Sequence, residues 1–173
     1  MRIFIGIDPG AKGGIAALDG DGQLILSCRF DGSDPGDVAM SNITTAQKIG
    51  TVEIVALEKV GAAPGQGVSS MFTFGVGVGL IKGWLRAGQI SFLEVAPVTW
   101  QRVTFGEGPP KERALNAAKA LWGVEKFIPT GCRVPHGGMI DAACLAEYIR
   151  RTIVGGGSVT PIKARKRGKV LKL

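Results

Sequence analysis

The order of the apolar segments constrains the fold of this chain more than any other feature. Residues Arg2 to Ile7, Gly13 to Leu18 and Gln23 to Phe30 each carry the pattern of a strand. The turn sequence Asp19-Gly20-Asp21-Gly22 separates the second from the third, so this opening is expected to be antiparallel. The later segment Val52 to Glu58 is almost continuously apolar, which is typical of a strand covered on both faces. These segments predict an α/β fold with a mixed sheet.

The remaining periodic segments supply the helices and one more strand. A fifth strand is expected at Ile90 to Val95, and helices are expected at Pro35 to Gly50, Val68 to Ala87, Pro97 to Gln101, Lys111 to Trp122 and Met139 to Ile153. We therefore expect one α/β domain over residues 1–154, with a mixed five-stranded sheet and flanking helices. A mobile Gly/Ala/Pro-rich loop is expected from Gly61 to Gly67, and a flexible basic tail over residues 155–173.

The helix expected at Val68 to Ala87 is unusual in its glycine content. It contains Gly75, Gly77, Gly79 and Gly83, and each glycine costs about 1 kcal/mol relative to alanine in a helix interior. Such a helix needs close packing, because a face of small residues lets a neighbouring helix or strand approach. The partner can lie inside the domain or across a dimer interface.

The composition indicates a polyanionic partner. The chain has 21 Lys and Arg against 14 Asp and Glu, a formal net charge of +7, so nucleic acid is the leading candidate. Many small basic proteins bind no nucleic acid specifically, and the motifs must decide. The three cysteines are too few for a disulfide framework and lack the close pairing of a zinc site. No signal segment and no apolar run of membrane-spanning length is expected, so we expect a cytoplasmic protein.

Three acidic residues stand where a metal site can be built. Asp8 follows the first strand, Glu58 closes the buried strand, and Asp141 lies at the start of the last helix. Taken singly, Asp8 could be a turn former and Asp141 could simply complement the helix dipole. If the two strands are neighbours, the three carboxylates together provide the oxygen ligands that Mg²⁺ prefers.

These acids lie in segments that resemble a known family. Ile5-Gly6-Ile7-Asp8-Pro9-Gly10, Ala56-Leu57-Glu58 and the segment Ile140 to Ala146 resemble, in order, the three acidic motifs of RuvC-like Holliday junction resolvases. The segments Gly65 to Gly75 and Ala96 to Gln101 are similar to the bacteriophage-type branch of that family.

The resemblance, over roughly residues 3 to 151, implies a ribonuclease-H-like fold and a homodimer that makes paired symmetric nicks in four-way DNA junctions. It also implies an Mg²⁺-dependent endodeoxyribonuclease with two Mg²⁺ or Mn²⁺ ions per site, held by Asp8, Glu58 and Asp141.

The family pattern also gives tentative roles to four further residues. Family members commonly carry a fourth metal-site residue before the last aspartate, and here His136 is the candidate, as a ligand, a group that positions the nucleophile, or a surface residue. Lys111 matches a family lysine near the scissile strand, although it could be a solvated lysine at a helix start. Some relatives place an aromatic wedge where this chain has Gly61. Phe72 or Phe74 could reach the junction instead, or could belong to the core.

General contacts to the DNA backbone are expected from basic side chains along the domain, namely Lys12, Arg113, Lys119, Arg150 and Arg151. Two other functions stay open at this point. The chain could be a nuclease for other branched DNA such as flaps and forks, or a junction-binding protein that does not cut. A sugar-kinase or actin-like interpretation of the first motif would require a second domain of similar fold, for which 173 residues leave no room.

Overall fold

The fold is built on one mixed five-stranded sheet. The computed structural model describes residues 1–30, 32, 34–61, 65, 67–105 and 110–156, with the backbone alone at 102–105, 110 and 111. The strands are β1 (Arg2–Asp8), β2 (Gly14–Asp19), β3 (Leu24–Arg29), β4 (Thr51–Glu58) and β5 (Phe92–Val95), in the spatial order β3-β2-β1-β4-β5. The first three strands are antiparallel, and β4 and β5 run parallel to β1. The expected antiparallel opening and the mixed sheet are both confirmed.

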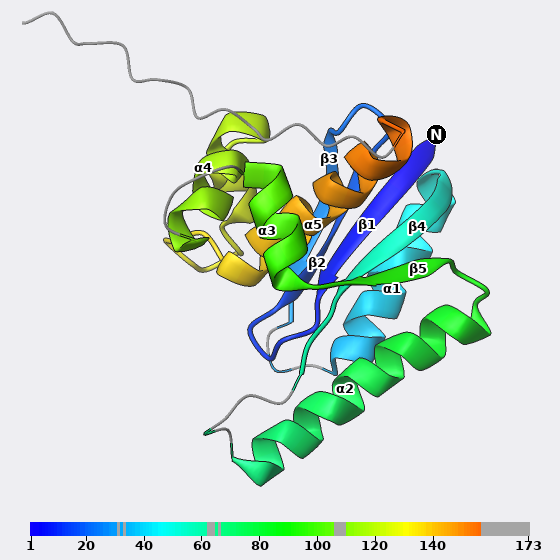
Figure 1. Ribbon diagram of the computed structural model, residues 1–173, viewed down its shortest axis with the longest axis vertical. Helices are drawn as coiled ribbons and strands as arrows, with labels where there is room; N and C mark the ends of the chain where they lie inside the picture. The colour runs from blue at the N-terminus through cyan, green and yellow to red at the C-terminus, as the bar shows by residue number, and fades with distance from the viewer. Residues whose placement is uncertain (31, 33, 62–64, 66, 106–109, 157–173) are drawn as a thin grey trace, which may run out of the picture.

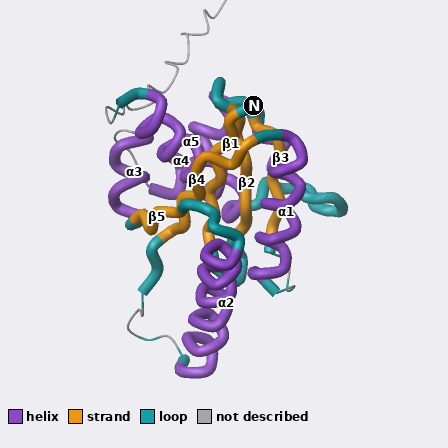
Figure 2. The backbone as a smooth tube through the Cα atoms, turned by 90° about the vertical axis from the view of Figure 1, so that its right-hand side faces the viewer, coloured by secondary structure: helices purple, strands orange, loops and turns teal. Residues whose placement is uncertain are grey.

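Helices cover both faces of this sheet. They are α1 (Pro35–Ile49), α2 (Val68–Ala87), α3 (Pro97–Phe105), α4 (Pro110–Leu121) and α5 (Gly137–Val154), with a short 3₁₀ turn at Val124–Phe127. Figure 1 and Figure 2 show α3, α4 and α5 on one face of the sheet, and α1 with α2 on the other. The chain is therefore a three-layer α/β domain.

Strand β1 lies at the centre of the sheet, and its side chains enter two separate cores. Phe4 belongs to the core between the sheet and the helices α3, α4 and α5. Ile3, Ile5 and Ile7 belong to the opposite core, beneath α1 and α2. Burial on both faces explains why the central strands are apolar over their whole length.

A glycine allows α5 to lie directly on the sheet. A side-chain carbon at Gly6 would collide with the backbone carbonyl of Ala142, so any larger residue would force the helix away from β1. Gly138 has the same role at the helix start, where an added Cβ would collide with the backbone of Lys12 and Gly13. These contacts fix the N-terminal turns of α5 against the end of β1.

Several element boundaries differ from the expected ones for local reasons. Strand β5 begins at Phe92, because the amide of Ile90 donates to the Leu85 carbonyl over 2.8 Å and closes the end of α2. Helix α5 begins two residues earlier than expected, since His136 caps it. The expected loop at Gly61 to Gly67 falls largely outside the described residues, as does the basic tail beyond residue 156.

Helix α2 carries an exposed apolar surface, and its first half projects beyond the edge of the sheet where β1 and β4 end (Figure 1). Five apolar residues at intervals of four, Val68, Phe72, Val76, Leu80 and Trp84, are 40–86% exposed, and we call them the α2 stripe. Among the described helices, α2 alone is long and apolar enough to cross a membrane. The expectation that no apolar segment reaches that length was therefore wrong. Its residues Ile81 and Leu85 nevertheless lie in the core.

Candidate active site

The carboxylates of Asp8 and Glu58 lie at the same edge of the sheet. Strands β1 and β4 are parallel neighbours, and Ile7 pairs with Leu57 in their register. The next residue on each strand is therefore one of the two acids, placed side by side where both strands end. The adjacency that the sequence left open is confirmed.

Asp141 comes to these two acids from the helix layer. It lies in the second turn of α5, which the close contact at Gly6 holds against β1. The pKa of Asp141 is raised to about 7 by burial first, and then by the negative charges of Asp8 and Glu58. Asp141 therefore lies within electrostatic range of the other two predicted acids.

Burial raises the pKa of the other two carboxylates as well, and like charge adds to the shift of Glu58. The pKa of Glu58 is raised to about 7, mainly by burial and then by the charge of Asp8, while a hydrogen bond from Trp100 opposes the shift. The pKa of Asp8 is raised by burial, although the Gly10 amide donates to its Oδ1 over 3.1 Å and His136 also opposes the rise. Because their ionised forms are destabilised, these carboxylates tend to bind protons or an added cation.

The described part of the chain does not neutralise these acids. The ion pairs between described residues involve other acids, at Glu53, Glu94 and Glu147. Among those residues, no group of three His, Cys, Asp or Glu side chains lies close enough together to hold a metal ion. The donor set suits a hard cation such as Mg²⁺, and side-chain rotation would be needed to close it around one.

Trp100 fixes the orientation of Glu58. Its indole Nε1–H donates to Glu58 Oε1 over 3.0 Å, and the ring is 1% exposed. The bond crosses from α3 to the end of β4, so it ties the helix layer to the sheet at the site. Beyond the family resemblance, the sequence pattern indicates no role for Trp100. A buried indole needs a hydrogen-bond acceptor, and that need was the available signal.

His136 lies beside the carboxylates and caps α5. Its Nδ1 accepts a long hydrogen bond, 3.4 Å, from the Met139 amide. An Nδ1 that accepts leaves the proton of a neutral imidazole on Nε2, which is then a donor and not a metal ligand. The His136 pKa is lowered, mainly by burial and then by Arg29, while Asp8 opposes the shift. The geometry thus favours a positioning role over ligation.

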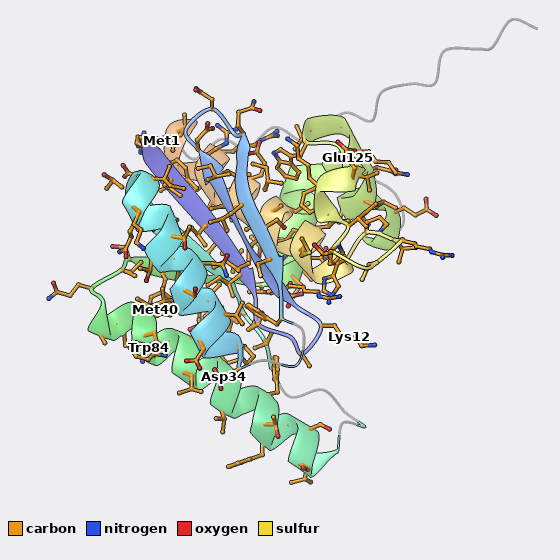
Figure 3. The ribbon with its side chains drawn as sticks, turned by 180° about the vertical axis from the view of Figure 1, so that it is seen from behind. Met1, Lys12, Asp34, Met40, Trp84 and Glu125 are labelled. Carbon is orange, nitrogen blue, oxygen red and sulfur yellow. The ribbon has the colours of Figure 1, made fainter. Side chains whose placement is uncertain are left out.

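The other residues with predicted roles at the site are less completely placed. Lys12 is exposed in the loop between β1 and β2, with its side chain pointing away from the sheet (Figure 3). Phe72 is 73% exposed on α2, so assigning it to the core was wrong, whereas Phe74 is half-buried. Lys111 lies in α4, and its side chain is outside the described part of the structure.

The basic residues expected to contact the DNA backbone occupy different settings. Lys119 is exposed and Arg113 half-buried on α4. Arg150 and Arg151 lie near the far end of α5 from Asp141, and both form ion pairs with buried Glu147, at 2.7 and 2.6 Å. These two arginines neutralise a buried acid within the fold, and contact with DNA stays a prediction for them.

Two cavities adjoin the acidic site. The first, of about 420 Å³, lies between α3, α4 and α5 and is lined by Ala114, Leu115, Pro135 and Ile140, and the described residues add the polar side chains of Gln101 and Asp141. The second, of about 310 Å³, lies between α2, the start of α1 and the loop after β1, with Pro9, Pro35 and Phe74 in its wall. No sequence pattern indicates a role for Gln101.

Comparison with known proteins establishes the fold. No protein-family model matches the chain, and no curated protein sequence matches it. Among solved structures, it is similar to Thermus thermophilus RuvC in complex with a Holliday junction substrate, with a TM-score of 0.59 and 11% identity over 92% of this chain and 99% of that chain. A second Thermus thermophilus RuvC structure gives 0.57 and 16% over 91% and 98%. The yeast mitochondrial Holliday junction resolvase Ydc2 gives 0.51 and 15% over 85% and 77%. The chain therefore has the ribonuclease-H-like fold of RuvC-like resolvases, as its motifs predicted.

Proposed function

We propose that this protein is a structure-selective endonuclease that resolves four-way DNA junctions by paired symmetric nicks. The observation that carries the proposal is that Asp8 and Glu58 end neighbouring parallel strands, with Asp141 on α5 within electrostatic range of both, and that burial raises the pKa of all three. Supporting observations are the fold shared with RuvC and Ydc2 and the net charge of +7. The carboxylates suit divalent cations and the net positive charge suits the phosphates of DNA.

The three carboxylates would hold the metal ions on which the reaction depends. Two Mg²⁺ or Mn²⁺ ions bound there would supply the positive charge that activates water and stabilises the transition state at the scissile phosphate. Asp8, Glu58 and Asp141 would be the side chains that hold these ions. Cleavage would leave a 5′ phosphate and a 3′ hydroxyl.

Other side chains would prepare the site for that reaction. Trp100 holds the Glu58 carboxylate in one orientation before any ion arrives. His136, with its proton on Nε2, would donate a hydrogen bond to the attacking water or to a phosphate oxygen. Lys12 and, by the family resemblance, Lys111 would supply positive charge to phosphates beside the cut.

Paired nicks on opposed strands require two sites related by a two-fold axis. We propose that the α2 stripe forms this dimer interface, because it exposes five large apolar side chains in a continuous row. Gly75, Gly79 and Gly83 on the same helix have open space where a side chain would extend, so a second helix could approach closely there. In that arrangement Phe72, at the projecting end of α2, would lie near the junction.

The decisive experiment is cleavage of a mobile synthetic four-way junction with each strand labelled in turn. The full-length protein with Mg²⁺ or Mn²⁺ should produce two nicks at symmetric positions in opposed strands. Asp8→Asn should bind the junction with unchanged affinity, because phosphate contacts remain, yet cleave at least about a hundredfold more slowly. Cleavage confined to flaps or forks would assign a different branched substrate. Junction binding without cleavage in either metal would make the protein a binding protein.

A further inference from the structure

We infer that the cavity beside Asp141 is a subsite for one nucleobase next to the scissile phosphate, and that Gln101 reads the hydrogen-bonding edge of that base. This inference rests on the proposed nuclease function. It adds a specificity-determining residue to a site whose other named groups contact the phosphate or the metals.

The cavity has the size and position of a ligand subsite. Its volume of about 420 Å³ lies within the range of about 300–1,000 Å³ that is usual for small-ligand pockets. Asp141 forms part of its wall, so a group in the cavity lies beside the carboxylates that would hold the reacting phosphate. Leu115, Pro135 and Ile140 make much of the remaining wall apolar, which suits the face of an unstacked base.

Gln101 brings an uncommitted amide to this apolar wall. Its side chain makes no hydrogen bond to the described residues, although it is half-buried. An amide covered by a ligand without a partner loses about 1–3 kcal/mol of hydration, so an occupant of this cavity should offer it hydrogen bonds. The neighbouring Trp100 is locked to Glu58 at 3.0 Å, and the start of α3 is therefore held in place with Gln101 on it.

The hydrogen-bonding groups of Gln101 suit the edge of a nucleobase. The Gln101 carboxamide presents one acceptor and two donors. A glutamine pairs through two hydrogen bonds with adenine, which shows an acceptor and a donor side by side. Adenine is thus the base expected in this subsite.

The test is to measure cleavage on junctions in which each base flanking the cut is varied in turn among the four bases. The wild-type protein should favour adenine at one fixed position by roughly 5- to 150-fold, the range expected for one bidentate base contact. Gln101→Leu should reduce that preference to less than about twofold while still cutting. Gln101→Glu should shift the preference toward cytosine, because a carboxylate accepts from its exocyclic amine. Gln47→Leu, on the exposed face of α1, is the matched control and should keep the wild-type preference.

Each outcome separates this inference from the proposed function. Preferences are ratios between substrates for one variant, so a lower overall rate does not disturb them. Equal cutting of all junctions by the wild type, or an unchanged preference in Gln101→Leu, would overturn the inference and leave the nuclease function intact. A wild-type protein that cuts no branched DNA with Mg²⁺ or Mn²⁺ would overturn both. Thermal melting of each variant confirms that it is folded.

Discussion

Trp100 and Glu58 form a hydrogen bond of 3.0 Å between the helix layer and the sheet, and this bond holds one of the three acids of the site. It is made by a tryptophan that is 1% exposed, so the donor cannot turn toward water instead. The bond also lowers the Glu58 pKa against the larger upward effects of burial and of Asp8. A residue without any charge therefore helps to keep the carboxylate ionised.

Replacing Trp100 with phenylalanine should weaken metal use more than it weakens the fold. Without the indole donor, the Glu58 pKa should rise above about 7, because a hydrogen bond that stabilises the charged carboxylate is lost. The Mg²⁺ concentration for half-maximal cleavage should increase, and the acidic limb of the pH profile should move to higher pH. Both are measured by junction cleavage across pH and Mg²⁺ series.

Trp122→Phe is the matched control for that variant. Trp122 is 6% exposed and its indole donates to the Gly22 carbonyl over 2.8 Å, outside the acidic site. It should lose stability to a similar extent without changing the metal dependence. An equal shift of the Mg²⁺ dependence in both variants would show that Trp100 acts through general stability alone.

The metal-free protein should lose stability as the pH rises from about 4 to about 7. Glu58 and Asp141 have folded pKa values of about 7, above their ordinary values of 4.5 and 3.8, so the folded state binds more protons than the unfolded state in that window. Asp141→Asn removes one repelling charge and should raise the melting temperature at pH 8, by about 2–4 °C per kcal/mol gained. Calorimetry at pH 5 and pH 8, with metals removed, measures the effect.

The higher melting temperature expected for metal-free Asp141→Asn should be lost when metal is present. Mg²⁺ stabilises the folded state only if that state binds it, so it should raise the melting temperature of the wild type more than that of Asp141→Asn. Asp37→Asn, at an exposed position on α1, should show neither effect. If the metal-free wild type were more stable than Asp141→Asn at pH 8, the repulsion assigned to these carboxylates would be wrong.

His136 should act on the maximal rate and leave the metal requirement unchanged. Because its Nδ1 caps α5, Nε2 is a donor, and His136→Ala should lower cleavage at saturating Mg²⁺ with little change in the half-maximal concentration. Loss of the cap should also cost about 1 kcal/mol of stability. His136→Asn retains a capping side chain and separates the two effects. A large rise in the Mg²⁺ requirement of His136→Ala, rescued by His136→Asp, would instead make the histidine a ligand.

Dimer formation through α2 can be tested by placing one charged side chain on this helix. Gly79→Glu places a carboxylate in open space beside the α2 stripe, so the monomer should fold normally while the dimer weakens by at least about tenfold, the loss expected for an unpaired charge placed in an interface. Light scattering should report twice the monomer mass for the wild type and concentration-dependent dissociation for the variant. Gln47→Glu on α1 should dimerise as the wild type does. A dimer that persists unchanged in Gly79→Glu would place the interface on another surface.

The antiparallel opening, the mixed sheet and the three candidate acids could be predicted from the sequence because their signals are local, whereas the adjacency of β1 and β4 could not. Continuous apolarity in β1 and β4 indicates burial on both faces, and each acid directly follows such a strand or lies in an amphipathic helix. The start of β5 was placed two residues too early, because the apolar pattern does not show that the Ile90 amide donates to Leu85, five residues earlier, and belongs to the end of α2. The exposure of the α2 stripe could not be predicted either, because an apolar helix has the same sequence pattern whether its apolar face is buried or exposed.

The finer parts of the site depend on contacts across the fold. Trp100 meets Glu58 over a separation of 42 residues, and no periodic pattern reports such a pair. The partners of Arg150 and Arg151 lie on their own helix at spacings of three and four, so their pairing with Glu147 was open to prediction from the sequence. They were instead taken for DNA contacts because net positive charge dominated the interpretation.

In the proposed function, adding one carbon atom at Gly6 would abolish DNA cleavage while leaving DNA binding in place. A methyl group there would lift α5, and with it Asp141, off β1 while leaving every acidic and basic residue in the chain. Such a protein would carry the same charge toward DNA yet hold its acids too far apart to share ions. A lineage with this fold can thus pass from cutting branched DNA to merely shielding it without any change in the residues that perform the chemistry.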